Sequence, residues 1–138
     1  NPDKQCLFFL FDIDNFKNVN DSYGHKVGDE VLVQIATQLK IMIGTRGICA
    51  RWGGEELAVY IPNLLEDEAV KIVSQIVKEI PKITNPSVTI SAGFVPWEKA
   101  DRPNFESVFL HADTALYMAK NNGKNQYCIF NESMQIQS

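Results

Sequence analysis

The stretch RWGGEEL, Arg51–Leu57, places two glycines directly before two glutamates and continues into the apolar run LAVYI. The preceding run ICARW is also strand-like, so Gly53 and Gly54 are expected to form the turn of a β-hairpin with positive φ at both residues. A turn needs only the glycines, which leaves Glu55 and Glu56 to be explained. Because side chains alternate along a strand, one glutamate can bind a metal ion while its neighbour points elsewhere.

Apolar runs on either side of the hairpin predict further strands. The run CLFFLF, residues 6–11, is apolar at every position, as expected of a strand covered on both faces. SVTISAGF, residues 87–94, reads as a strand with Val88, Ile90 and Ala92 on one side, followed by a loop, and QYCIF, residues 126–130, as a last short strand. Pro62 is expected to end the second strand of the hairpin.

Three helices are predicted between these strands from apolar residues at helical spacing. The first has the stripe Val27, Val31, Ile35, Leu39 and Met42 and is expected to end at Gly44 and Gly47. The second carries Ala69, Ile72, Val73, Ile76, Val77 and Ile80, and Pro81 is expected to break it. The third carries Phe105, Val108, Phe109, Ala112, Ala115, Leu116 and Ala119, and Gly123 closes it. This order of elements predicts an α/β (α+β) fold with a mixed central sheet flanked by helices.

Length and charge limit the class of protein. The 138 residues are 45% apolar, which fits one domain, residues 1–138, with a substantial core. A net charge of −4 argues against nucleic acid as a partner, because surfaces that bind massed phosphates are usually basic. Cys6, Cys49 and Cys128 lie in apolar runs without C-x-x-C spacing, which indicates buried reduced thiols of a cytosolic protein. No apolar run reaches membrane-spanning length, so we expect no membrane contact by this domain and a cytoplasmic location, including that of a domain in a membrane-bound parent.

Two aspartates, Asp12 and Asp14, stand at the end of the most apolar strand. Ligand crevices in open α/β sheets lie beyond strand ends, where a carboxylate can hold a cation. The alternative is that the sequence DID only solvates a strand terminus. An EF-hand loop is excluded, because it needs an oxygen ligand at Phe16 and a glycine at Lys17.

The aspartates after the first strand and the glutamates of the hairpin together suggest a metal site. If the strand of residues 6–11 pairs beside the hairpin, Asp12 and Glu55 converge. Two carboxylates and a backbone carbonyl, completed by phosphate oxygens of a substrate, commonly hold magnesium. The alternative is a solvated hairpin with acidic residues at its tip.

Other familiar sites are absent from the sequence. It contains neither G-x-x-x-x-G-K-[ST] nor G-x-G-x-x-G, which excludes P-loop and dinucleotide-binding sites. Lysines follow the DID segment and flank the Asn121–Gly123 turn, but their spacing alone does not distinguish them from solubilising residues. His25 and His111 are isolated, and we interpret both as structural. Trp52 and Trp97 are interpreted as packing residues.

Four motifs in order, DIDNFKNVNDSYGHKVGDEVL, RWGGEELAVYIP, SVTISAGF and ADTALYMAKNNGKNQ, resemble the GGDEF domain of diguanylate cyclases. The resemblance runs from about Cys6 to Phe130 and is far more specific than a single short motif. It implies a palm-like fold similar to nucleotide cyclases and polymerases. It also implies condensation of two GTP molecules into cyclic di-GMP with release of pyrophosphate.

Residue by residue, the resemblance implies a metal site, a guanine site and a phosphate site. Asp12, Glu55 and the carbonyl of Ile13 would bind Mg²⁺ or Mn²⁺, two ions per active site, with Glu56 at the catalytic centre. The remaining roles are guanine recognition by Asn20 and Asp29, and neutralisation of the triphosphate by Lys17, Lys120 and Lys124. An ionised aspartate accepts from guanine N–H groups, and an amide both donates and accepts. Gly53 and Gly54 would let the substrate approach the turn.

The implied mechanism is metal-assisted phosphoryl transfer between two bound GTP molecules. Each domain holds one GTP, so catalysis needs a homodimer in which two domains face each other. An upstream sensory or regulatory domain would control that encounter. The chain begins just before the first strand, without the preceding helix and Asp-x-Leu-Thr turn usual in the family, so we expect a trimmed piece of a longer multidomain parent, with uncertain activity on its own.

Three departures from the family pattern bear on activity. Leu57 replaces a phenylalanine, and Lys124 replaces a common arginine, which keeps the charge but loses bidentate geometry. Gly44 and Gly47 occupy the positions of the inhibitory Arg-x-x-Asp motif, and Arg46 is out of register, so we expect no product inhibition through that site. The leading hypothesis is a diguanylate cyclase. The alternatives are a catalytically inactive GTP-binding regulatory module and a protein-interaction domain, of which the last predicts no thermal shift with GTP.

Overall fold

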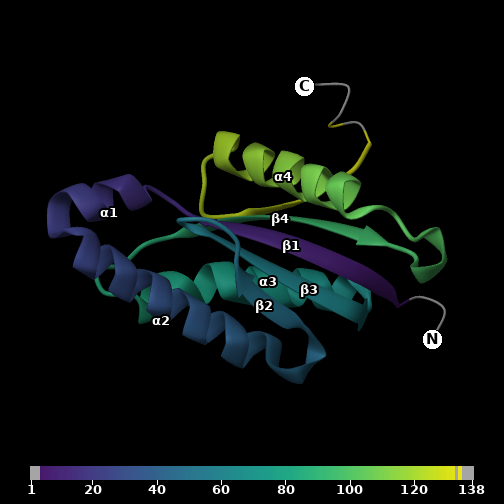
Figure 1. Ribbon diagram of the computed structural model, residues 1–138, viewed down its shortest axis with the longest axis horizontal. Coiled ribbons are helices and arrows are strands. Elements are labelled where there is room, and N and C mark those ends of the chain that lie inside the picture. Colours follow the sequence, from purple (N-terminus) through teal and green to yellow (C-terminus); the bar gives the residue numbers. More distant parts are fainter. Residues whose placement is uncertain (1–3, 133, 135–138) are drawn as a thin grey trace.

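The computed structural model describes residues 4–132 and 134, so both ends of the expected 1–138 domain lie outside the described residues. One mixed sheet of five strands, in the order β2-β3-β1-β4-β5, forms its centre. Neighbouring strands are antiparallel except β4 and β5, which are parallel. The predicted mixed sheet flanked by helices is therefore confirmed (Figure 1).

The elements follow one another with short connections. The strands are β1 (Gln5–Ile13), β2 (Ile48–Arg51), β3 (Glu56–Leu64), β4 (Ile90–Trp97) and β5 (Tyr127–Ile129). The helices are α1 (Phe16–Tyr23), α2 (His25–Ile43), α3 (Glu66–Ile83) and α4 (Phe105–Asn121), with two short 3₁₀ turns at Gly44–Arg46 and Lys99–Asp101. None of the helices in the described residues has the length and apolar character needed to cross a bilayer.

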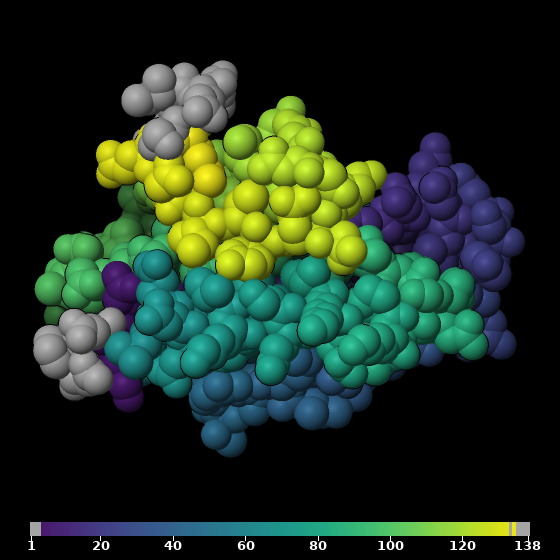
Figure 2. Space-filling model, turned by 180° about the vertical axis from the view of Figure 1, so that it is seen from behind, coloured from purple at the N-terminus to yellow at the C-terminus, as the bar shows by residue number. Residues whose placement is uncertain are grey.

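Strand β1 is buried on both faces, as its unbroken apolar sequence predicts. Leu7, Phe9 and Phe11 face the larger core, with α2 and α3, whereas Phe8 and Leu10 face the smaller core under α4. Figure 1 shows α4 alone above the sheet and α2 and α3 below it. From behind, the teal surface of α3 lies below the yellow-green surface of α4 (Figure 2). The central strand thus ends at a fixed place between two packed layers.

The predicted helical stripes are largely buried. Val31, Ile35 and Leu39 of α2 lie in the larger core, and all six predicted residues of α3 are buried. Phe105 is the exception on α4, because it is 51% exposed at the first helical position. Gly44 is the C-cap of α2 with φ of 62°, and Gly123 follows the α4 C-cap Asn122 with φ of 124°, as expected of glycines that end helices.

Several predicted boundaries are wrong. Helix α1 was not expected, because its apolar residues on the buried side are only Phe16 and Val19, too few for a visible period. It is followed almost directly by α2, which begins at His25, before the first residue of the predicted stripe, Val27. Strand β4 also continues to Trp97 where a loop was expected.

Two prolines do not end their elements. β3 continues through Pro62 to Leu64, because it has no ladder with β2 beyond Tyr60 and its pairing with β1 shifts register there. α3 continues past Pro81 to Ile83. Proline lacks the N–H that would donate to the carbonyl of Val77, so it removes one bond near the end of the helix. The end itself is closed by the Thr84 hydroxyl, which donates to the carbonyl of Ile80 at 2.8 Å.

The glycines of the hairpin do not adopt the predicted conformation. Among the described residues the glycines with positive φ are Gly24, Gly44 and Gly123, not Gly53 or Gly54. The turn spans residues 52–55 and is closed by the backbone N–H of Trp52, which donates to the carbonyl of Glu56 at 2.8 Å. A loop of this length does not need the mirror-image geometry of a two-residue hairpin turn.

The cysteines are free, and Cys6 is buried as predicted, whereas Cys49 and Cys128 are only half-buried. Trp97 stacks on Tyr60, and Trp52 packs against Phe105 and Phe109, in line with their interpretation as packing residues.

Candidate active site

The end of β1 brings the two acidic clusters together. In the strand register Asp12 lies opposite Glu56 of β3 on one side and Ser91 of β4 on the other. The backbone N–H of Ile13 donates to the carbonyl of Glu55 at 3.4 Å. The antiparallel pairing of β1 with β3 therefore places Asp12, Ile13 and the glutamates of the hairpin at one edge of the sheet.

The carboxylate of Asp12 is nearly enclosed. Its side chain is 15% exposed, Oδ2 lies 3.3 Å from Nζ of Lys120, and Oδ1 is buried without a hydrogen-bond partner among the described residues. Burial raises the pKa of Asp12 to about 6; Lys120 opposes this shift, and the neighbouring carboxyl group of Glu55 adds to it. A buried oxygen that lacks a partner is a ready ligand for a cation.

Glu56 extends the acidic cluster. Burial raises its pKa first, followed by the charges of Asp12 and of Asp113 on α4, while Lys120 lowers it. Asp113 was not singled out in the sequence, because it occupies an ordinary exposed position of an amphipathic helix. Among the described residues, Lys120 is the cation whose charge lowers the pKa of both Asp12 and Glu56, and it stands against several carboxylates.

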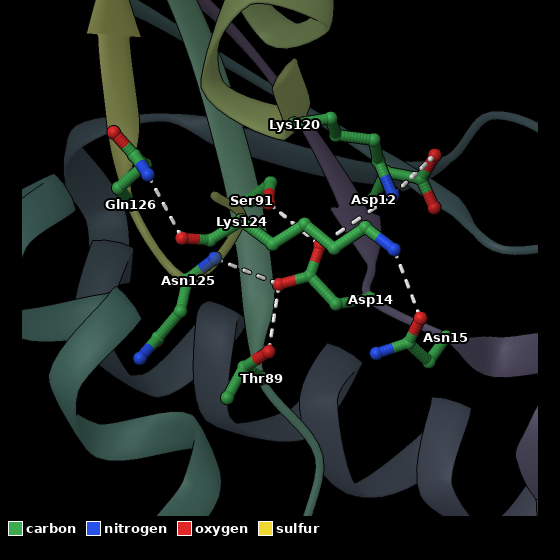
Figure 3. A network of polar contacts seen from close by, with 9 residues as sticks. All are labelled: Asp12, Asp14, Asn15, Thr89, Ser91, Lys120, Lys124, Asn125 and Gln126. Atoms are coloured by element: carbon green, nitrogen blue, oxygen red, sulfur yellow. Dashed lines mark hydrogen bonds and ion pairs between the residues drawn. The ribbon is translucent and has the colours of Figure 1, made fainter. Parts of the chain in front are cut away.

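Asp14 is the centre of a second network, joined to Asp12 through Lys120, that sequence reasoning missed. Only 2% of the residue is exposed. Figure 3 shows its two oxygens at the meeting point of Ser91, Thr89 and the backbone of Asn125. The one available signal was its place in DID beyond a buried strand, which does not distinguish a buried hub from a solvated strand end.

Two of the three predicted phosphate lysines lie next to these aspartates. Lys120 contacts Asp12 and Asp14, and Nζ of Lys124 donates to Oδ1 of Asn15 at 2.9 Å (Figure 3). Lys17 is exposed in the first turn of α1, which begins just beyond the strand end. The lysines thus come from α1, from α4 and from the turn that follows α4.

The predicted guanine-reading residues lie at the junction of α1 and α2. A Cβ at Gly28 of α2 would clash with Oδ1 of Asn20, so the absence of a side chain there lets Asn20 lie against α2. Asp29 is the next residue along α2 and is exposed. An amide and a carboxylate are therefore presented by adjacent segments.

A cavity of about 320 Å³ adjoins the site on the side of α1. It is lined by Asp14, Asn15, Asn18, Val19, Ser22, Tyr23, Pro86, Ser87, Val88 and Thr89, rather than by Asp12 and Glu55. Within residues 4–132 and 134, no three carboxylate, histidine or cysteine side chains gather as a complete metal-binding set. A cation at Asp12 would therefore need backbone or substrate oxygens among its ligands.

The comparisons agree with this geometry. The family model described as "Diguanylate cyclase, GGDEF domain" matches residues 1–126. This chain belongs to that family. It is 46% identical to the uncharacterized protein YtrP of Bacillus subtilis over 89% of the chain, and 36% identical to the diguanylate cyclase DgcM of Escherichia coli over 85% of it. It spans 21% of YtrP and 29% of DgcM, so both relatives are much longer proteins.

Solved structures of GGDEF domains share the fold. The active GGEEF domain of a diguanylate cyclase from Vibrio cholerae superposes with a TM-score of 0.84 at 31% identity, covering 94% of this chain and 85% of that one. The GGDEF domain of DgcB from Caulobacter crescentus, in complex with cyclic di-GMP, gives a TM-score of 0.83 at 27% identity, covering 91% and 78%. The fold predicted from the family resemblance is therefore confirmed.

Proposed function

We propose that this GGDEF domain is a diguanylate cyclase that joins two GTP molecules into cyclic di-GMP across a dimer of domains. The observation that carries the proposal is the convergence of Asp12 with the glutamates of the hairpin, beside Lys120. An acidic cluster next to lysines suits a substrate that arrives as a metal complex of a triphosphate.

The chain's residues fit a divalent cation. Oδ1 of Asp12 is buried and unpartnered among the described residues, and the neighbouring Glu55 supplies a second carboxylate. Asp12, Glu55 and the carbonyl of Ile13 would hold the Mg²⁺ or Mn²⁺ ions, two per active site. When bound, these ions stabilise negative charge on the reacting α-phosphate and make the attacking 3′-hydroxyl more acidic.

The protein groups have distinct tasks in this proposal. Asn20 and Asp29 orient the guanine, while Lys17, Lys120 and Lys124 bind the triphosphate and neutralise its charge. Glu56 lies at the reacting end, where a raised pKa suits a group that accepts or relays a proton. Each domain binds one GTP, so two domains would have to face each other for the 3′-hydroxyl of one nucleotide to reach the α-phosphate of the other.

A regulatory module that binds GTP without turnover is the second candidate. It is motivated by Leu57 and Lys124, where the family commonly has phenylalanine and arginine. Leu57 is 3% exposed and belongs to the larger core, so this position still carries a packed apolar side chain. Lys124 already reaches Asn15, which keeps its charge near the strand end.

The test is GTP turnover by the domain fused to a dimerising segment, with cyclic di-GMP measured by chromatography. Asp12→Asn and Glu55→Gln remove one proposed ligand charge each and are expected to lower turnover by about 100-fold or more. Glu66→Gln, an exposed acid at the start of α3, is the matched control and should leave turnover unchanged. Full turnover in both site variants would show that the metal assignment is wrong. GTP binding without product would favour the regulatory module.

We also propose that this domain is attached to other domains in a longer protein. The curated relatives are several times longer than the stretch that this chain matches, which supports a domain attached to sensory or regulatory parts in a longer protein. We propose a cytoplasmic location, because GTP is a cytoplasmic substrate.

A further inference from the structure

We propose that Asp14 is a positioning residue for the phosphate end of the site. It would hold the turn between α4 and β5, together with the Lys120 side chain, so that Lys120 and Lys124 face the acidic cluster. The inference rests on the proposed function, because the lysines matter only if a polyphosphate binds there. It assigns a task to a carboxylate outside the proposed metal, guanine and phosphate ligands.

All the acceptor capacity of the Asp14 carboxylate is used. Oδ1 accepts from Oγ of Ser91 at 2.6 Å and from Nζ of Lys120 at 3.4 Å. Oδ2 accepts from Oγ1 of Thr89 at 2.7 Å and from the backbone N–H of Asn125 at 2.9 Å. An ionised carboxylate has about four acceptor positions, and a buried one is tolerated only when such partners are in place.

These donors come from three separate segments. Ser91 lies at the start of β4 and Thr89 directly precedes that strand, Lys120 belongs to the last turn of α4, and Asn125 to the turn before β5. Figure 3 shows the carboxylate of Asp14 between them. One buried side chain therefore fixes the sheet, the helix and the turn relative to each other.

The turn depends on such a tether because of its backbone. Lys124 and Asn125 both have positive φ, 64° and 53°, a conformation that is uncommon for a lysine, although asparagine adopts it more readily. This conformation is held by the N–H of Lys124, which donates to the carbonyl of Ala119 at 3.1 Å, and by that of Asn125, which donates to Asp14. In this conformation the Lys124 side chain crosses to Asn15 at the end of β1.

Lys120 has two anionic partners, so the loss of one still leaves it paired. Its Nζ lies 3.3 Å from Asp12 and 3.4 Å from Asp14. If Asp12 binds a metal ion instead of Lys120, Asp14 remains as the anion that keeps Lys120 in place. Asp14 would therefore act through the lysines and would not touch the substrate itself.

Asp14→Asn tests this role with little change in shape. Its amide group still accepts at one atom but donates at the other, so it cannot serve Lys120 and the N–H of Asn125 together. Calorimetric titration with Mg²⁺-GTP should show affinity about tenfold weaker than in the unchanged chain, the factor that goes with loss of one charge-assisted contact. Binding of guanosine, which lacks phosphates, should be unchanged when followed by NMR. Equal GTP affinity, or equal losses for GTP and guanosine, would overturn the proposal.

Control variants separate positioning from loss of stability. Thr84→Ala removes a buried hydroxyl that accepts from the N–H of Val88 at 3.1 Å, away from the lysines. It should lower the melting temperature but leave GTP affinity intact in the folded protein. If Asp14→Asn does not fold, Ser91→Ala removes one donor and keeps the carboxylate, and GTP affinity should fall about threefold. Unchanged affinity in Ser91→Ala would then count against the role.

Amide exchange separates this inference from the proposed function. In Asp14→Ala, which removes every acceptor of this side chain, the N–H of Asn125 should lose its protection from exchange, whether or not the chain binds GTP. Retained protection overturns the inference. Failure of the unchanged chain to bind GTP would instead overturn the proposed function, and with it the purpose given to the tether.

Discussion

Nζ of Lys120 lies 3.3 Å from Oδ2 of Asp12, which joins the last turn of α4 to the end of the central strand. This ion pair holds the pKa of Asp12 below the value that burial and Glu55 would otherwise impose. Lys120→Met should therefore raise the pKa of Asp12 above about 6, which a carboxyl ¹³C NMR titration measures.

The same variant tests the proposed phosphate contact. Loss of one charge-assisted contact to GTP should raise KM about tenfold. Lys71→Met on the exposed side of α3 is the matched control and should leave KM and the pKa of Asp12 unchanged. A pKa for Asp12 that does not rise in Lys120→Met would contradict the electrostatic role of this ion pair.

Asp12 should destabilise the metal-free domain at neutral pH. Its folded pKa of about 6 lies above the ordinary aspartate pKa of 3.8, so the folded protein holds this proton more tightly than the unfolded chain. The contribution of Asp12 to the free energy of unfolding is then greatest below pH about 4 and is lost as the pH rises through about 6. Asp12→Asn should raise stability at pH 7 by on the order of 1 kcal/mol, allowing for solvent screening, and by less at pH 4.

Thermal unfolding in the presence of a chelator, at pH 4 and pH 7, provides the measurement. Glu66→Gln, an exposed acid on α3, should show no such pH-dependent gain. A melting temperature of Asp12→Asn below that of the unchanged chain at pH 7 would mean that the ion pair with Lys120 outweighs the cost of burial.

Gly28→Ala should impair guanine recognition more than stability. Alanine favours a helix by about 1 kcal/mol over glycine, but its Cβ would collide with Oδ1 of Asn20 and displace that side chain. We expect the preference for GTP over ATP, measured as a ratio of binding constants, to fall about tenfold while the melting temperature changes little. Thr37→Ala, on the exposed side of the same helix, is the control for substitution itself. Intact selectivity in Gly28→Ala would remove the guanine role from Asn20.

The layers of the fold could be predicted from the sequence, because long apolar runs and helical apolar stripes indicate which segments and faces are buried. The sequence was insufficient for α1, whose two buried residues Phe16 and Val19 make no period, and for Pro62 and Pro81, past which β3 and α3 continue near their ends. At the site, Asp12 and Glu55 could be paired from the order of the strands. Asp14 could not be separated from a solvated strand end, since its four donors lie far away in the sequence.

Gly93→Ala should prevent stable packing of α4. A Cβ on Gly93 of β4 would strike backbone atoms of Ala112, Ala115 and Leu116, which cannot move aside as a flexible side chain could. We expect a loss of about 3 kcal/mol or more in the free energy of unfolding, measured by urea denaturation. Gly54→Ala should lose less than about 0.5 kcal/mol. Because α4 carries Lys120, any folded Gly93→Ala should also bind GTP weakly.

Cyclic di-GMP should not inhibit this domain through the segment that joins α2 to β2. Gly44 and Gly47 offer no side chains there. Arg46 is turned back on the end of α2, donating from Nη2 to the carbonyl of Met42 at 2.6 Å and from Nε to that of Ile43 at 3.1 Å. A bound dinucleotide would have to displace those contacts to recruit the guanidinium. Initial rates of the dimerised domain should therefore stay constant as cyclic di-GMP is added, and Arg46→Ala should change neither the rates nor their response. Strong inhibition that disappears on changing the Gly44–Gly47 segment would show that Arg46 leaves the helix end to bind product.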